Sequence, residues 1–313
     1  MGETGIKAET GARPETAREK TAGLVSDRKA EAAPGPRDRL RRLRVPSRPR
    51  IWFELVLIAV SYGIYSLIRN AAPERVTQAQ HHARDVWHLE SRLGLDFEHA
   101  VNHALAKIDW LIVPMNYYYA TLHFLVTIAV LVWLFRSHPG RYGAARGALF
   151  ATTAIALVGY YLYPLAPPRL ITGGHFIDTS TVHHTWGSLA AEDTAAASMS
   201  NQYAAMPSMH IGWSVWCAIA VVTLARPLWL KVLGGLYPPA TLLVIVATAN
   251  HFWLDAVGGL VCVAFGFTVS RLWYGRWWHR LPRRVPGATG EPVLEGGLAD
   301  VPRPGIPRPE DPR

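Results

Sequence analysis

The sequence is poor in charged side chains and in cysteine. Of its 313 residues, 18% are charged, against about a quarter in an ordinary soluble domain. The two cysteines, Cys217 and Cys262, lie inside apolar runs and have no partner at metal-ligand spacing. This excludes a disulfide framework and predicts two small buried hydrophobes. Half of the residues are hydrophobic, so a membrane protein fits the composition better than a soluble domain does.

The net charge of +9 is distributed unevenly. Residues 1–50 carry 13 Lys and Arg against 7 Asp and Glu, whereas residues 51–273 carry 12 against 11. A basic nucleic-acid-binding domain clusters positive charge on its folded part, so this pattern argues against nucleic acid as a partner. The apolar middle also argues against disorder there. We therefore expect a membrane protein with basic ends.

Six apolar runs have roughly the ~20 residues that span hydrocarbon. They predict an all-α, polytopic membrane protein with a six-transmembrane-helix bundle in residues 49–280. Residues 1–48 are expected to form a disordered basic cytoplasmic tail, and the Pro-rich residues 281–313 a second one. The runs are Ile51–Ile68, Leu111–Phe135, Gly147–Pro164, His210–Ala225, Trp229–Ala249 and Phe252–Trp273.

The segment Arg69–Trp110, between the first two runs, is more polar. Its apolar residues recur at steps of three or four, which predicts one amphipathic helix lying along the membrane interface. These residues are Val86, Leu89, Leu93, Phe97, Val101 and Leu105.

The placement of Lys and Arg predicts the orientation in the membrane. The N-terminal tail, the links after the second and fourth runs, and the C-terminal flank all carry positive charge, and six spans place them on one side. From Leu170 to Ala225 there is no Lys or Arg. We expect both termini in the cytoplasm, the chain in the plasma membrane, and the long loop of residues 165–209 outside.

Polar residues interrupt the apolar pattern in three segments that this topology places on the outer face. Tyr163–Arg169 ends the third run, Met206–His210 starts the fourth, and Asn250–Asp255 joins the fifth to the sixth. Ionisable groups near lipid are costly and usually mark a site. Three such segments at one depth predict a functional site there.

His251 and Asp255 are four residues apart, which on a helix places both side chains on one face. A carboxylate bound to one ring nitrogen fixes the tautomer and raises the basicity of the other nitrogen, as a histidine nucleophile or base requires. Two other interpretations stay open. The pair could only stabilise a helix end, or it could share a metal ion.

His210 and Arg169 suit phosphate chemistry. His210 follows Ser208 at a loop-to-helix junction, where a serine caps the helix and backbone N–H groups attract anions. A histidine there can protonate a leaving oxygen. Arg169 is the only Lys or Arg between Leu149 and Ala225 and could bind phosphate with its planar donor fork, or snorkel to the interface.

In order, spacing and membrane setting, these segments resemble the type-2 phosphatidic acid phosphatase superfamily, the lipid phosphate phosphatases, over residues 110–273. The common signature has Lys and Arg where this chain has Leu162 and Ile245. The variants Ala-Pro-Pro-Arg, Ala-Met-Pro-Ser-Met-His and Asn-His-Phe-x2-Asp instead look like the inositolphosphotransferase-like branch, which contains the inositol phosphorylceramide synthases. The Asn116–His123 motif, Asn-Tyr-Tyr-Tyr-x3-His, also resembles that branch.

The resemblance implies a metal-independent lipid phosphatase or phosphotransferase without a cofactor, whose partners are membrane lipids and a lipid phosphate or phospholipid substrate at the outer leaflet. His251 would attack phosphorus and form a phosphohistidine, Asp255 would orient it, and His210 would protonate the leaving oxygen. Arg169 and the backbone around Ser208 would hold the phosphoryl oxygens. Candidates for the role of the replaced Lys and Arg are Asn250, His123 and Asn201.

The motifs leave the donor lipid, the acceptor and the oligomeric state open. Water as acceptor gives hydrolysis, as in a polyprenyl or phosphatidic acid phosphatase, whereas an alcohol gives transfer. A proton-coupled transporter is a different possibility, although its polar residues would be distributed through the membrane depth. A metal-dependent hydrolase would use His210, His251, Asp255 and Asp178.

Overall fold

Helices make up the regular secondary structure of the computed structural model. Within the described ranges there is no strand, and an isolated bridge pairs Leu165 with Ala204. The expected all-α class is confirmed over these residues. The described helices belong to one compact unit, while the two predicted tails lie almost entirely outside the described residues. The structure describes residues 2, 49–71, 75–185 and 203–285.

Four helical stretches among the described residues are long and apolar enough to cross a membrane. This supports the expected membrane character by length and composition, whereas the count of six spans stays a prediction. Two shorter apolar helices accompany them, Ile51–Ser61 within α3 (Ile51–Ala71) and α11 (Met209–Leu224). The four stretches are Asp109–Ser137, α8 (Pro139–Leu162), α12 (Leu228–Ala247) and α13 (Trp253–Tyr274).

The Asp109–Ser137 stretch is not a uniform α-helix. It consists of α6 (Asp109–Tyr117), a π-helical turn η1 (Tyr118–Leu122) and α7 (His123–Ser137). π-Helical turns inside α-helices are rare and often occur at functional sites. The apolar pattern predicted the helix but not this turn.

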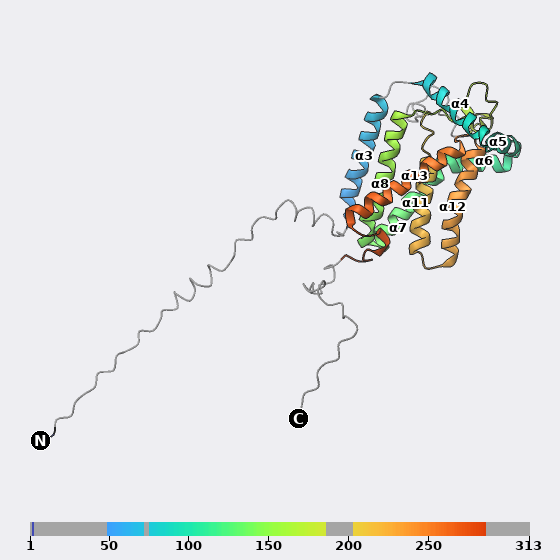
Figure 1. Ribbon diagram of the computed structural model, residues 1–313. Coiled ribbons are helices and arrows are strands. Elements are labelled where there is room, and N and C mark those ends of the chain that lie inside the picture. Colours follow the sequence, from blue (N-terminus) through green and yellow to red (C-terminus); the bar gives the residue numbers. More distant parts are fainter. Residues whose placement is uncertain (1, 3–48, 72–74, 186–202, 286–313) are drawn as a thin grey trace, which may run out of the picture. The chain divides into compact units, whose positions relative to one another are not determined.

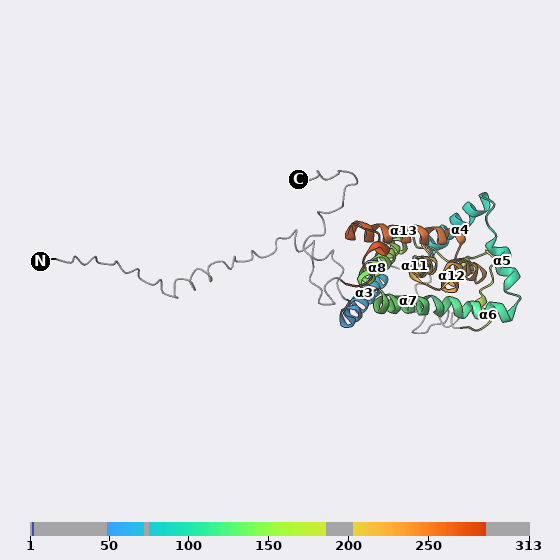
Figure 2. The same cartoon turned by 90° about the horizontal axis from the view of Figure 1, so that it is seen from below.

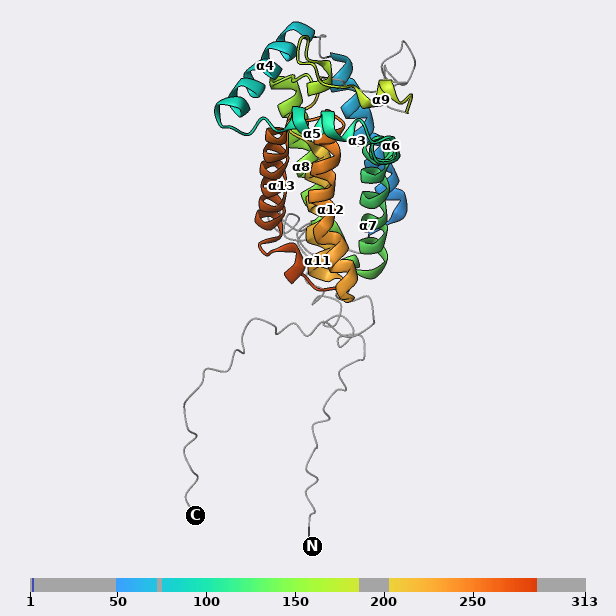
Figure 3. The ribbon, with the colours of Figure 1, turned by 90° about the vertical axis from the view of Figure 1, so that its right-hand side faces the viewer.

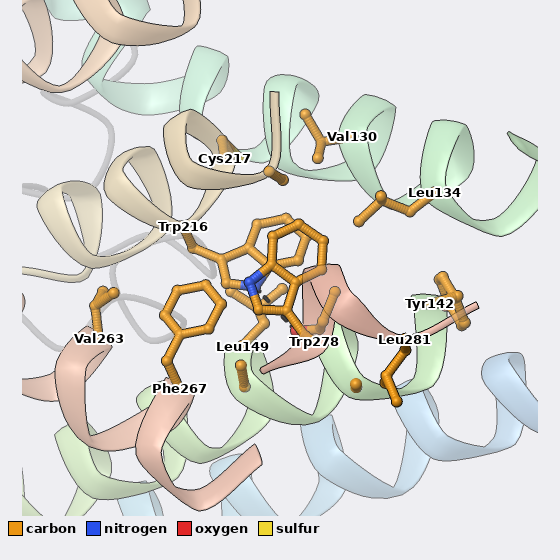
Figure 4. Packing of buried hydrophobic residues seen from close by; sticks show 14 residues of the cluster. Val130, Leu134, Tyr142, Leu149, Trp216, Cys217, Val263, Phe267, Trp278 and Leu281 are labelled. Carbon is orange, nitrogen blue, oxygen red and sulfur yellow. Dashed lines mark hydrogen bonds between the residues drawn. The ribbon is translucent and has the colours of Figure 1, made fainter. Parts of the chain in front are cut away.

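Helix α11 lies in the middle of the long helices and packs against α7, α8, α12 and α13 (Figure 2). One hydrophobic cluster, shown in Figure 4, joins α7, α8, α11 and α13 around Trp216 and Trp278. Trp216 is fully buried and donates its indole N–H to Ala145 O at 2.9 Å. Cys217 and Cys262 are buried and free, as predicted.

Helices α8 and α13 pack most extensively because glycines let their backbones approach. A Cβ added at Gly266 would collide with Ala148 O and with the Thr152 hydroxyl. A Cβ at Gly259 would collide with Ser208 O at the start of α11. The two glycines therefore fix the position of α13 relative to both neighbours.

The prediction of one amphipathic helix over Arg69–Trp110 is wrong. The segment forms two helices, α4 (Val76–Arg92) and α5 (Glu98–Leu105), which lie across the ends of the long helices (Figures 1 and 3). Gly94 has a φ of +68°, a conformation that favours glycine and ends the first helix. The buried face of α4 consists of Ala79, Ala83, Val86 and Glu90, whereas Leu89, Leu93 and Phe97 are exposed.

Candidate active site

The three polar segments meet at one end of the long helices, in the turns that follow α8 and α12 and precede α11 and α13 (Figure 3). Backbone hydrogen bonds hold them together. Ser208 N–H donates to Asp255 O at 2.9 Å, and Arg169 N–H donates to Ala249 O at 2.9 Å. Short loops 165–170 (with η2, Pro168–Leu170) and 248–252 thereby bring side chains from distant parts of the sequence into one site.

His251 and Asp255 are in contact, but not on one helix face as the spacing predicted. His251 precedes α13, Phe252 is the N-cap, and Asp255 lies in the first turn. His251 Nδ1 donates to Asp255 Oδ2 at 3.1 Å, and the same oxygen accepts the Phe252 N–H at 3.0 Å. One carboxylate therefore caps the helix and holds the imidazole.

The other nitrogen of this imidazole is available. His251 is 4% exposed, and its Nε2 is buried with no hydrogen-bond partner. Because Nδ1 carries the proton that Asp255 accepts, Nε2 carries the lone pair. A buried polar atom without a partner is costly, so its persistence here favours a functional role.

His210 lies beside His251, with ring centroids 5.5 Å apart. Its Nε2 donates to the backbone carbonyl of Tyr119 at 3.2 Å, and its ring stacks on the Tyr119 ring. His123 Nδ1 donates to the same carbonyl at 3.1 Å, and its ring centroid is 4.1 Å from that of His210. Tyr119 belongs to the π-helical turn η1, which thus orients two histidines.

Arg169 connects the turn before α13 to the loop after α8. Its Nε donates to Asn250 Oδ1 at 2.9 Å and its Nη1 to Asp178 Oδ2 at 3.1 Å. Asn250 is oriented in turn by a 2.9 Å bond from its Nδ2 to the Thr248 hydroxyl. The guanidinium has five N–H donors, so these contacts leave others for a phosphate.

Ser208 is buried, and its polar groups are used within the fold. Its N–H binds Asp255 O, and its hydroxyl accepts the Ile211 N–H at 3.5 Å as the N-cap of α11. Asn201, the remaining predicted phosphate ligand, lies outside the described residues. Among the residues that are described, no three His, Cys, Asp or Glu side chains gather as a metal site would require.

Sequence reasoning missed several residues around the site. Asp178, considered only as a metal ligand, pairs with Arg169 and also caps the short helix α9 (Thr179–Val182). Glu90 and Glu98, on α4 and α5, accept backbone N–H groups of α13. The sequence held a signal for the burial of Glu90 alone, because Glu90 lies four residues after Val86 on the buried face of α4.

The comparisons with known proteins give one match. Residues 84–269, more than half of the chain, match the family model described as the PAP2 superfamily. The matched segment contains all the described residues named above for the site. No curated protein and no solved structure matches the chain.

Proposed function

The chain belongs to the PAP2 superfamily, and from that premise we propose that it is a membrane phosphotransferase or phosphatase that acts on a lipid phosphate or phospholipid headgroup through a phosphohistidine on His251. The observation that carries the proposal is the imidazole of His251. Its Nδ1 is bound to Asp255, while its Nε2 is buried, unpartnered and next to His210. A free lone pair beside a proton donor suits a nucleophile.

In the first half-reaction, the Nε2 lone pair of His251 attacks phosphorus, and the bond between phosphorus and the leaving oxygen breaks. His210, protonated on both ring nitrogens, gives its Nδ1 proton to that oxygen while its Nε2–H stays on the Tyr119 carbonyl. Asp255 stabilises the positive charge that develops on His251, because its carboxylate accepts the Nδ1–H throughout. Phosphoryl transfer depends mainly on positioning and on neutralising charge, which these fixed groups supply.

In the second half-reaction, the acceptor oxygen attacks the phosphohistidine, the P–N bond breaks, and His210 takes the acceptor's proton. Arg169 binds the phosphoryl oxygens in both steps, held by Asn250 and Asp178. Its planar guanidinium matches phosphate in a way that a lysine does not. His123 and Asn250 are the described candidates for the charge and polarity that the replaced Lys and Arg supply in the common signature.

We propose that the protein is inositolphosphotransferase-like, and the assay described below decides whether water or an alcohol is the acceptor. The support is the sequence variant at each signature: Arg169 after Ala-Pro-Pro, His210 after Ala-Met-Pro-Ser-Met, and Asn250 before His251. We also propose six spans with both termini in the cytoplasm, a topology in which the reaction takes place at the outer leaflet of the plasma membrane. The support for this topology is the absence of Lys and Arg from Leu170 to Ala225.

The test uses the purified protein in detergent with EDTA, against phosphatidic acid, a polyprenyl diphosphate and phosphatidylinositol, each labelled in its phosphate. We expect turnover of at least one donor and an acid-labile, base-stable label on the protein. The label should be absent in His251→Ala and present in the control His81→Ala, since His81 is exposed and pairs with Asp85. Adding inositol distinguishes transfer from hydrolysis by the product.

Two results would overturn parts of the proposal. Full turnover by His251→Ala excludes the phosphohistidine. Activity that is lost in EDTA and restored by zinc favours the metal-dependent hydrolase.

A further inference from the structure

The first turn of α13 makes an unusual set of contacts. The first N–H groups of a helix have no partner within the helix, and here three carboxyl groups accept them. Asp255 accepts the Phe252 N–H at 3.0 Å, Glu98 accepts the Trp253 N–H at 3.0 Å, and Glu90 accepts the Leu254 N–H at 3.1 Å. The two glutamates come from α4 and α5, outside the membrane-spanning stretches.

Both glutamates are inaccessible to solvent, at 0% and 1% exposure. Burial, together with the charges of Glu98 and Asp255, raises the pKa of Glu90 to about 9. Burial also raises the pKa of Glu98, with a contribution from Asp96 in the turn between α4 and α5. Two interacting buried carboxyls retain a shared proton at neutral pH.

The contact geometry agrees with a neutral Glu90. Its Oε1 accepts the Leu254 N–H, while its Oε2 is buried with no hydrogen-bond donor facing it. An oxygen in this position is costly as part of a carboxylate and less costly when protonated. Glu98 then carries the remaining negative charge of the pair, next to the positive end of the helix dipole.

We propose that Glu90 and Glu98 are positioning residues of the active site, which hold the first turn of α13 in place and with it Asp255 and His251. Helices α4 and α5, which carry these glutamates, thus position the active site in addition to packing over the ends of the long helices. If α4 and α5 only packed against α13, apolar side chains at positions 90 and 98 would be sufficient. Here instead two carboxyl groups, one from α4 and one from α5, accept consecutive N–H groups of α13 and so fix the position at which α13 starts. The catalytic part of this inference rests on the proposed function.

The test compares Glu90→Gln and Glu98→Gln with Glu90→Leu and Glu98→Leu in the full-length protein. Glutamine keeps an acceptor for the N–H group, so we expect kcat within about threefold of wild type. Leucine leaves a buried N–H unpaired, and we expect kcat to fall about 10- to 100-fold with little change in KM, because His251 is displaced and substrate contacts are kept.

The matched control is Glu54→Leu. Glu54 is also a buried carboxylate, paired with Arg146 and Tyr142 between α3 and α8, and it does not contact the site. We expect it to lower the melting temperature without lowering kcat per folded molecule. If the leucine variants at 90 and 98 behave like Glu54→Leu, the pair has only a structural role and the proposal is wrong.

A second readout does not need an active enzyme. Hydrogen exchange of the backbone amides of residues 252–256 should accelerate in the leucine variants and stay slow in the glutamine variants. This pattern in a protein that turns over no lipid phosphate would refute the proposed function and support the positioning role. Normal exchange and normal kcat in the leucine variants of an active, His251-dependent enzyme would refute the positioning role alone.

The pH dependence of stability gives a third readout. The folded-state pKa of Glu90, about 9, lies above its ordinary value of 4.5. The contribution of Glu90 to the free energy of unfolding is therefore fully present below about pH 4.5 and is lost as the pH rises through about 9. We expect the melting temperature of the wild type to fall over this window and that of Glu90→Gln to fall less. An equal fall in both would show that Glu90 is not the group that titrates.

Discussion

The two ends of helix α13 are built on different principles. Its start, which with Arg169 and His210 we call the polar end, has carboxyl groups on its first N–H groups and an unpartnered nitrogen on His251. The other end belongs to the cluster of Figure 4, and we call this end together with that cluster, which includes Trp216 of α11, the packed end. There Phe267 packs near Trp278, and Ser270 donates to Ala144 O.

This difference indicates that one end of α13 serves mainly the stability of the fold and the other mainly the activity. At the packed end, close packing stabilises the fold, and polar groups such as the Trp216 indole are satisfied. At the polar end, buried polar atoms are left free at a cost in stability, as expected where strain serves function. Substitutions at the packed end should therefore change stability alone, and substitutions at the polar end should change mainly activity.

The largest effect should come from His251→Ala. Removal of a covalent nucleophile lowers kcat by about 10⁴-fold or more. The melting temperature should change little, because loss of the Nδ1 bond to Asp255 and of the contacts with the Tyr119 and His210 rings is offset by removal of the buried, unpartnered Nε2. Steady-state turnover and a thermal melt of the same sample check both. A large loss of stability would show that the pair is a structural cap.

The next effect should come from Trp216→Ala at the packed end. A fully buried tryptophan replaced by alanine costs about 3–5 kcal/mol, to which the lost bond to Ala145 O contributes. We expect a lower melting temperature and, below the melt, unchanged kcat per folded molecule. A specific loss of kcat in this variant would break the division between the two ends.

Arg169→Lys should have an intermediate effect at the polar end. Lysine keeps the charge but loses the Nε bond to Asn250 and the fork that binds phosphate. Charge-assisted hydrogen bonds contribute about 1.5–3 kcal/mol, so kcat/KM should fall about 10- to 100-fold. Asp178→Asn, measured alongside, should have a smaller effect because an amide oxygen still accepts from Nη1.

How far the sequence predicted this arrangement depends on the range of the interactions. The apolar runs predicted the helices, with α11 starting one residue before the predicted His210, because hydrophobic length is local information. The three polar segments could be recognised because each interrupts an apolar run locally. Because successive spans alternate in direction, all three segments were expected at the same face of the membrane. His251 and Asp255 were predicted to touch, although the reason given was wrong: the contact crosses the N-cap of α13.

The remainder depends on contacts between distant residues. Gly94 ends α4 where the periodicity predicted a continuous helix, because a glycine with positive φ overrides an apolar pattern. Glu90 was not singled out within the predicted interfacial helix, although it is fully buried. Its partner is the N–H of Leu254, 164 residues away, and no local pattern in the sequence indicates such a pairing.

The smallest and sharpest comparison uses two hydroxyls of similar setting. Ser270 and Thr248 are both buried and each makes a 2.8 Å bond to a helix carbonyl. Ser270→Ala and Thr248→Val should each lower the free energy of unfolding by about 1 kcal/mol. Thr248 also accepts a bond from Asn250, which orients Arg169, so Thr248→Val alone should lower kcat/KM, by about threefold to tenfold. Because the stability losses match, an equal change of activity in both variants would mean that the two ends of α13 respond as one unit.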